Sequence, residues 1–335
     1  MEYAELTFRA EQLVFAEFGN PADVLKPEPR DITLLPGEVW VRILASPLNP
    51  ADLNTIEGTY GIRPALPATP GIEGCGVVEN GNGTEFLEGE RVMFLGRAAA
   101  WASHVAVPNE ALFRLPSGID PLQAALLKVN PATAWQLLHG FRTLQPGDWI
   151  VQNLGNSAVG RCVIQLARDL GIRTLSFVRR EGLFSELKAL GADQVFLDDE
   201  GGAAAARDLL GGANAALAFN AVGGESALRL MKLLAEGGTH ITYGAMGRKP
   251  VTLPNGLLIF RDIRVCGLWV SRWIECAPRE EIIAVYEDLA GRVTAGRLVQ
   301  EVDSVFPLED FQAALARLDA AERAGKVLFR PVPRA

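Results

Sequence analysis

Cysteine and histidine are scarce in this chain of 335 residues, and their scarcity excludes two kinds of site. The four cysteines form no CxxC pair and lie far apart, at Cys75, Cys162, Cys266 and Cys276. Such spacing is not that of a disulfide framework, so we expect a reducing compartment. The three histidines are equally scattered, whereas zinc needs three or four clustered ligands. The sequence therefore predicts neither a disulfide scaffold nor a metal site.

Basic charge and long apolar runs are also lacking. The 32 lysines and arginines are outnumbered by 40 aspartates and glutamates, which gives a net charge of −8. A field of that sign argues against nucleic acid as a partner and against a basic membrane-surface protein. No stretch approaches the roughly 18 consecutive apolar residues of a membrane span, and the acidic start lacks the features of a secretory signal. We expect a cytoplasmic protein, or one of the mitochondrial matrix if a presequence has been removed.

Apolar residues make up 49% of the chain, which suffices for about two domains with cores of their own. Alternating polar and apolar residues predict short strands in the first part, at 38–43, 71–78 and 90–94. From near residue 120, buried strands alternate with helices. We expect these strands at 148–153, 172–178, 194–196, 215–220, 239–243 and 264–268, and helices at 157–170, 183–190 and 226–234. This alternation is typical of a doubly wound α/β domain with a parallel sheet.

The end of the chain is too short to form a domain. It contains helical runs near 279–291 and 308–320 and a strand at 326–329. We therefore expect this tail to pack back on the β-rich first part.

A glycine-containing turn joins the first strand of the α/β part to its first helix. The turn consists of Gly155, Asn156, Ser157, Ala158, Val159 and Gly160. Free N–H groups and the positive end of the helix dipole favour a pyrophosphate at such a place. Ser157 replaces the middle glycine of the usual GxGxxG pattern and can cap the helix. The turn predicts a dinucleotide site, and the alternative is an ordinary connection without a ligand.

The second strand of the α/β part runs directly into Arg179 and Arg180. NAD sites place an acidic residue there for the ribose hydroxyl, whereas NADP sites place arginine near the 2′-phosphate. Two guanidinium groups can clamp a phosphate with forked hydrogen bonds. We therefore predict NADPH rather than NADH. The alternative is a solvated basic turn in which Glu181 pairs with one arginine.

The chain resembles the medium-chain dehydrogenase/reductase superfamily over nearly its full length, and more narrowly the mitochondrial type of trans-2-enoyl-thioester reductase. The stretches that carry the resemblance are SPLNPADLN at 46–54, EGTYG at 57–61, VNPATA at 129–134, QN at 152–153, NSAVG at 156–160, YGAM at 243–246 and GLWVSRW at 267–273. Quinone reductases of the superfamily share the first-domain features. The phosphate turn and the GLWVSRW run favour the enoyl reductases.

The resemblance implies two domains and a homodimer. A GroES-like catalytic domain would comprise residues 1–126 and 267–335, and a Rossmann domain that binds NADPH would comprise residues 127–266. Zinc-dependent relatives hold their metal through cysteine and histidine, but the corresponding positions here are Asn49 and Ile72. The resemblance therefore implies a metal-free enzyme.

The resemblance also implies a reaction, the reduction of the C2=C3 bond of trans-2-enoyl thioesters carried on CoA or acyl carrier protein. Hydride would go to Cβ and a proton to Cα. Tyr60 matches the family's catalytic tyrosine, as proton donor or as the group that orients the thioester, and a phenol stays protonated at pH 7. Asn49 would hydrogen-bond within the active site. The structural alternatives are a packing tyrosine and an Asn-Pro turn.

Further cofactor contacts are implied by position within the matching stretches. They are Asn130, Thr133, Tyr243, Gly244, Ala245, Met246, Leu268, Trp269, Val270 and Lys326. Asn130 equally suits a cap before Pro131, Trp269 and Trp273 equally suit a core, and Lys326 equally suits solvent. Two rival functions remain at this point: a quinone or activated-alkene reductase on the same scaffold, and an NADPH-binding sensor without turnover.

Overall fold

The structure is a computed structural model that describes residues 6–212 and 214–331, and it divides into two compact units. Unit 1 comprises Met1–Val129 and Cys276–Ala335, and unit 2 comprises Asn130–Glu275. Unit 2 extends beyond residue 266, where we expected the Rossmann domain to end. The reason is helix α10 (Val270–Cys276), whose Trp273 stacks on Trp135 of helix α4 (Asn130–His139) with ring centroids 6.4 Å apart.

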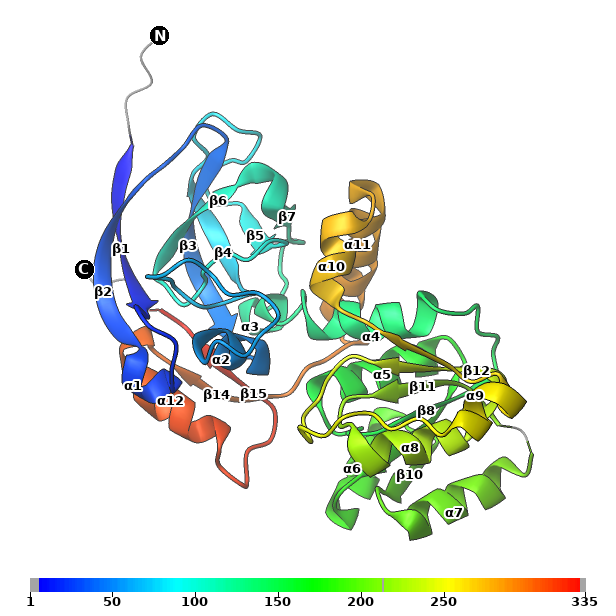
Figure 1. Ribbon diagram of the computed structural model, residues 1–335. Coiled ribbons are helices and arrows are strands. Elements are labelled where there is room, and N and C mark those ends of the chain that lie inside the picture. The colour runs from blue at the N-terminus through cyan, green and yellow to red at the C-terminus, as the bar shows by residue number, and fades with distance from the viewer. Residues whose placement is uncertain (1–5, 213, 332–335) are drawn as a thin grey trace. The chain divides into compact units, whose positions relative to one another are not determined.

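Unit 1 is built on a sheet in the order β14-β15-β3-β4-β5-β7, with β6 paired to β3 (Figure 1). Its strands are β3 (Glu38–Pro47), β4 (Cys75–Asn80), β5 (Arg91–Phe94), β6 (His104–Pro108), β7 (Leu112–Arg114), β14 (Val302–Phe306) and β15 (Lys326–Phe329). A separate antiparallel ribbon is formed by β1 (Thr7–Val14) and β2 (Lys26–Thr33). Because β15 pairs antiparallel with β3, the prediction that the tail packs on the first part is confirmed.

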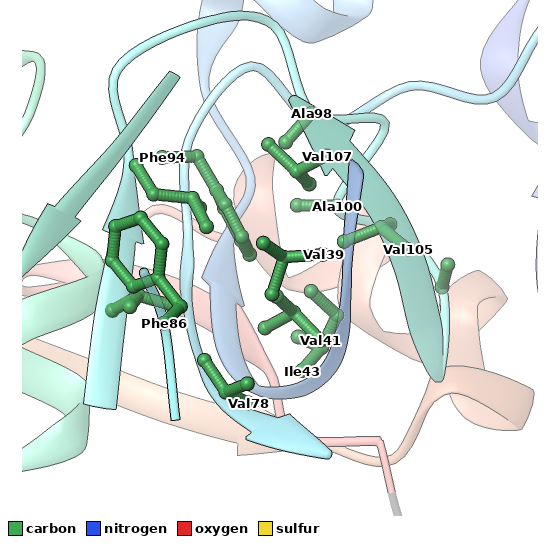
Figure 2. Close-up of a cluster of buried hydrophobic side chains, with 13 residues drawn as sticks. Val39, Val41, Ile43, Val78, Phe86, Phe94, Ala98, Ala100, Val105 and Val107 are labelled. Carbon is green, nitrogen blue, oxygen red and sulfur yellow. The ribbon is translucent and has the colours of Figure 1, made fainter. Parts of the chain in front are cut away.

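The helices of unit 1 are short, apart from one near the end of the chain. They are α1 (Pro21–Val24), α2 (Pro50–Ile56), α3 (Pro121–Ala125), α11 (Arg279–Thr294) and α12 (Phe311–Leu318). Inward-facing residues of the sheet form an apolar core around Val39, Val41, Phe94 and Val105 (Figure 2). Burying each such side chain contributes roughly 1.5–3 kcal/mol, so this core makes the strand ends of unit 1 firm supports for polar side chains.

Unit 2 contains a parallel sheet in the order β10-β9-β8-β11-β12-β13, with helices on both faces (Figure 1). Its strands are β8 (Trp149–Gln152), β9 (Arg173–Val178), β10 (Gln194–Leu197), β11 (Ala215–Asn220), β12 (Leu234–Thr242) and β13 (Arg264–Gly267). Helices α5 (Ala158–Asp169) and α6 (Phe184–Leu190) pack in one apolar cluster, and α7 (Glu200–Leu210) and α8 (Gly224–Lys232) pack in another. The predicted doubly wound fold is confirmed. Strand order reverses between β8 and β11, which is where such sheets bind ligands.

The predicted strand at 71–78 is wrong in its first half, since β4 begins only at Cys75. Gly71 has φ +106°, a conformation that side-chain-bearing residues rarely adopt. The carboxylate of Asp52 accepts the backbone N–H groups of Gly71 and Ile72 at 3.2 and 2.8 Å. These N–H groups therefore cannot pair with a neighbouring strand. Burial raises the pKa of Asp52 to about 6, and these backbone donors oppose the shift.

No helix in the described ranges combines the length and apolarity that a membrane crossing requires.

The polar residue that stands out in the sheet of unit 2 is His240, which is fully buried in β12 between Ala218 and Val265. Neither ring nitrogen has a hydrogen-bond partner within the described residues. Burial lowers the pKa of this imidazole to about 4.

We expect replacement of His240 by leucine to flatten the pH dependence of stability. The folded protein keeps the imidazole neutral down to about pH 4, whereas the unfolded chain takes up a proton near the ordinary pKa of 6.5. Stability therefore falls as the pH drops from 6.5 toward 4, by up to about 3 kcal/mol from this group. Urea unfolding between pH 4 and pH 6.5 measures the effect. The control is His139→Leu, which removes an exposed imidazole of the same unit. Equal slopes for wild type and His240→Leu would contradict the assignment.

Candidate active site

Backbone contacts gather the predicted cofactor residues of unit 2 at the carboxyl edge of its sheet. Gly155 donates its N–H to Phe177 at the end of β9, at 3.1 Å. Tyr243, directly after β12, donates to Asn220 at 3.0 Å, and Leu268, directly after β13, donates to the last residue of β12 at 3.0 Å. The turn at 155–160 and the segments at 243–246 and 268–270 thus follow strand ends at the same edge of the sheet.

The glycines of the phosphate turn are required by close approach. A Cβ at Gly155 would lie 2.7 Å from Cβ of Ser176, and one at Gly160 would lie 2.7 Å from the carbonyl oxygen of Gly155. The hydroxyl of Ser157 accepts the N–H of Gly160 at 3.1 Å and caps α5. The turn is therefore tight, and the other N–H groups at the start of this helix of 12 residues point toward any anion that binds there.

Tyr243 adds a buried polar atom to the same place. Its hydroxyl lies near Ser157, which lowers its pKa against a larger rise caused by burial. The hydroxyl nonetheless has no hydrogen-bond partner of good geometry among the described residues. A buried donor without a partner is costly, and a polar group of a bound ligand would satisfy it. The turn and this phenol together fit a dinucleotide.

The two arginines after β9 are available to a ligand. Arg179 and Arg180 are both exposed, and neither side chain makes an ion pair or hydrogen bond within the described ranges. Glu181 begins a 3-10 turn and pairs with neither of them. The alternative in which Glu181 neutralises one arginine is thus removed, although the predicted clamp on a 2′-phosphate stays a prediction.

A buried hydrogen-bond network supports the carboxyl edge of the parallel sheet. Asn153, directly after β8, donates from Nδ2 to Oδ1 of Asn220 and to Oγ of Ser226, each at 2.8 Å. Its Oδ1 accepts the N–H of Ala221 at 2.8 Å. Ala221 in turn accepts the N–H of Met246 at 2.8 Å. Asn153 therefore fixes the segment on which the 243–246 loop rests.

An ion pair completes the network. Ser226 donates to Oδ2 of Asp198 at 2.6 Å, and Arg229 holds Oδ1 of the same carboxylate at 2.8 and 3.1 Å. Sequence reasoning missed Asn220, Ser226, Asp198 and Arg229 as parts of the site. A signal was present, since Asn220 ends a buried strand and Asp198 directly follows another, the positions that meet at the carboxyl edge of a parallel sheet.

In unit 1, the short helix α2 positions both predicted catalytic residues. Asn49 stands at its N-cap and is 3% exposed. Past the other end, Tyr60 donates its backbone N–H to the carbonyl of Asn54 at 3.0 Å. The guanidinium of Arg97 lies over the Tyr60 ring, 5.4 Å from its centroid, and donates to Thr55 at 3.2 Å. Tyr60 is partly exposed on a loop. Its backbone hydrogen bond and the contact of its ring with Arg97 hold it in place.

The side chain of Asn49 is held by two charged groups. Its Nδ2 donates to Oε1 of Glu73 at 2.8 Å, and its Oδ1 accepts the ammonium of Lys326. Lys326 is buried, so the alternative of a solvated lysine is excluded. The structure brings Lys326 together with Asn49, and its predicted contact with the cofactor stays a prediction.

The remaining predicted residues lie in unit 2. Asn130 and Thr133 are buried on α4. Trp273 stacks on Trp135 and serves as packing, whereas Trp269 keeps 39% of its surface exposed. The two tryptophans, which the sequence left equivalent, therefore have different surroundings.

Comparison with known proteins identifies the family. Residues 35–117 match the model of the alcohol dehydrogenase GroES-like domain, and residues 158–287 match that of the zinc-binding dehydrogenases. The chain is 41% identical over 318 residues to the mitochondrial enoyl-[acyl-carrier-protein] reductase of Xenopus tropicalis, covering 91% of each protein. It is 37% identical to the human protein of that name, covering 92% of this chain and 85% of the relative. The chain belongs to the enoyl-[acyl-carrier-protein] reductase family.

Solved structures agree with this membership. An Etr1p/NADP/crotonyl-CoA complex has a TM-score of 0.88 at 28% identity and covers 96% of this chain and 100% of its own. A proposed NADPH:quinone reductase from Bacillus thuringiensis has a TM-score of 0.91 at 29% identity, covering 97% and 100%. The predicted superfamily, with its GroES-like and Rossmann parts, is confirmed, and this enoyl reductase family member is an oxidoreductase that acts on CH–CH groups.

The zinc in the name of one family model does not fit the residues of this family member. Asn49 already engages Glu73 and Lys326 through both ends of its carboxamide, and Ile72 carries no ligand atom. An ammonium at Oδ1 of Asn49 is incompatible with a divalent cation at the same atom. In the described part of the chain, no three His, Cys, Asp or Glu side chains are grouped as a metal site.

We expect Asn153→Ala to destabilise the protein by about 3 kcal/mol or more, because it leaves buried partners in Asn220, Ser226 and Ala221 unsatisfied. Thr242→Val removes a single acceptor of the network, 3.1 Å from Asn220, and should cost only about 1 kcal/mol. Denaturant unfolding of both variants measures the difference. A cost for Asn153→Ala no larger than that for Thr242→Val would show that Asn153 does not organise the network.

Proposed function

We propose that the protein reduces the C2=C3 bond of trans-2-enoyl thioesters, with NADPH as the hydride donor. The observation that carries the proposal is the 41% identity, over 91% of both chains, to an enoyl-[acyl-carrier-protein] reductase. The NADP and crotonyl-CoA named for a solved relative support the cofactor and the thioester class. The unpaired Arg179 and Arg180 support NADPH over NADH, because two guanidinium groups suit a 2′-phosphate.

The two units would contribute different parts of the chemistry. Bound NADPH supplies a hydride to C3 of the enoyl chain. In unit 2, the turn at 155–160 and Tyr243 would bind the dinucleotide's phosphates, with Asn130, Thr133 and the segments at 243–246 and 268–270 around it. In unit 1, Tyr60 would donate the proton to C2 or orient the thioester, and Asn49 and Lys326 would complete the polar surroundings. Hydride and proton together saturate the bond, and NADP⁺ is the second product.

A substrate panel tests this function. Oxidation of NADPH with crotonyl-CoA and trans-2-decenoyl-CoA should exceed that with a quinone or a simple enone about a hundredfold in kcat/KM, a difference of about 2.7 kcal/mol. The proposed quinone reductase among the structural relatives makes quinone reduction the second candidate. A higher kcat/KM for quinone or enone would select that candidate, and binding without turnover of any substrate would indicate a sensor.

Tyr60→Phe should lower kcat/KM for the enoyl thioester at least about tenfold, since it removes a proton donor and leaves the ring in place beside Arg97. Binding of NADPH, followed by its fluorescence, should be unchanged and serves as control. A kcat/KM within about twofold of the wild-type value would exclude the assigned role.

Arg179→Ala and Arg180→Ala should each raise the KM for NADPH about tenfold or more and leave the KM for NADH unchanged. A charge-assisted hydrogen bond contributes about 1.5–3 kcal/mol, and about 1.4 kcal/mol corresponds to tenfold. Arg207→Ala, an exposed arginine on α7, is the matched control. Equal effects on both cofactors would contradict the clamp.

We also propose that the protein forms a homodimer through the free edge of its parallel sheet. Strand β13 ends that sheet, and Val265 on it is exposed. On the preceding helix α9 (Asn255–Arg261), Ile259 and Phe260 are 70% and 80% exposed. Apolar groups beside an unpaired strand edge favour association, and Etr1p and Etr2p of Candida tropicalis are described as a heterodimer.

Phe260→Glu should convert this dimer to a monomer in light scattering coupled to size exclusion. Leu87→Glu changes an equally apolar, 67% exposed residue of unit 1 and should leave the dimer intact. A monomeric wild-type protein, or a dimer that Phe260→Glu does not weaken, would refute the proposed interface. The relatives are mitochondrial by name. For this chain, the expected cytoplasmic location, or the mitochondrial matrix if a presequence has been removed, stays a prediction.

A further inference from the structure

Glu73 places a fully buried carboxylate in unit 1, just after the turn at Gly71. Its Oε1 accepts Nδ2 of Asn49 at 2.8 Å, and its Oε2 accepts the backbone N–H of Val129 at 2.9 Å. Each oxygen therefore holds a different segment of the chain. The function proposed above assigns no role to this carboxylate.

The partners of Glu73 keep it in place despite its burial. Burial raises the pKa of its carboxyl, and the Lys326 charge, the hydrogen bonds from Asn49 and Val129 and the Lys128 charge oppose that rise. A buried carboxylate costs several kcal/mol unless such partners stay in place. Asn49 is thereby oriented at both ends, with Nδ2 toward Glu73 and Oδ1 toward Lys326.

The second segment that Glu73 holds leads out of unit 1. Lys128 donates from Nζ to the carbonyls of Ile72 and Gly96 at 2.7 and 2.5 Å, and its own carbonyl accepts the hydroxyl of Tyr286 at 3.0 Å. Val129 is the last residue of unit 1, and Asn130 begins α4 and unit 2. The backbone that enters α4 is thus fixed next to the same turn that carries Glu73.

We propose that Glu73 is a positioning residue for the reaction proposed above. Through Oε1 it sets the direction of the Asn49 carboxamide, and through Oε2 it fixes the backbone that leads to Asn130. Glu73 itself neither gains nor loses a proton in the reaction. The reaction part of this inference rests on the proposed function, whereas the two hydrogen bonds are independent of it.

Glu73→Gln tests the proposal because glutamine offers one acceptor oxygen in place of two. Either the amide of Asn49 or the N–H of Val129 then faces another donor. We expect kcat with an enoyl thioester to fall about tenfold to a hundredfold, with the KM for the thioester within about twofold. Amide hydrogen exchange of the peptide that contains Val129 should quicken, and this readout needs no substrate.

The double variant Asn49→Asp/Glu73→Gln separates positioning from simple stability. It exchanges carboxylate and carboxamide, so the introduced glutamine donates to the introduced aspartate and its oxygen accepts the N–H of Val129. The aspartate still accepts from Lys326. We expect this exchange to restore at least about tenfold in kcat over Glu73→Gln, together with slow exchange at Val129. Glu90→Gln, which removes a carboxylate bound to Arg114 elsewhere in unit 1, is the control and should match wild type.

Two results would overturn the proposal: a kcat for Glu73→Gln within about twofold of wild type, or a loss of kcat of which the double variant recovers no part. If the wild-type protein reduces no enoyl thioester, the proposed function fails instead. Amide exchange at Val129 then still shows whether Glu73 holds that segment.

Discussion

A carboxylate or carboxamide that leaves water on folding must find hydrogen-bond partners in the protein, and both units are organised by this requirement. In unit 2, Asn153 meets it by joining the ends of β8 and β11 and the start of α8. In unit 1, Asn49 and Glu73 meet it together with Lys326. Because each buried group is costly without its partners, these networks fix the loops at their margins more firmly than apolar packing alone would.

The proposed chemistry follows from what these networks hold. In unit 2 they support the segments that we propose to surround a dinucleotide, where Gly155 allows the turn to lie against Ser176. In unit 1 they support α2, which carries Asn49 at its start and leads to Tyr60 past its end. In the proposed reaction, hydride delivery and proton delivery would depend on different networks, and the junction at Val129 belongs to the network that contains Glu73.

The parallel sheet could be predicted because its strands are apolar runs bounded by turns, and β9 at Arg173–Val178 lies within the predicted 172–178. Helix α7 was not among the predicted helices, because its run of alanines and two glycines carries no clear apolar periodicity; in the structure the side chain of Asp199 caps it by accepting the N–H of Gly202. The contact of Asn49 with Lys326 joins residues 277 positions apart, so no local pattern encodes it. Only the resemblance pointed to these residues, and the structure supplied their common surroundings.

The most direct test of the account is the fate of hydrogen isotopes in the reduced thioester. Crotonyl-CoA is reduced in two separate reactions, with NADPH that carries deuterium on one or on the other face of C4. One of these two reactions should place one deuterium at C3 of the product. Reduction with unlabelled NADPH in D₂O should place one deuterium at C2. Deuterium absent from C3 with both labelled cofactors, or oxidation of NADPH that leaves the double bond intact, would contradict hydride transfer to an enoyl thioester.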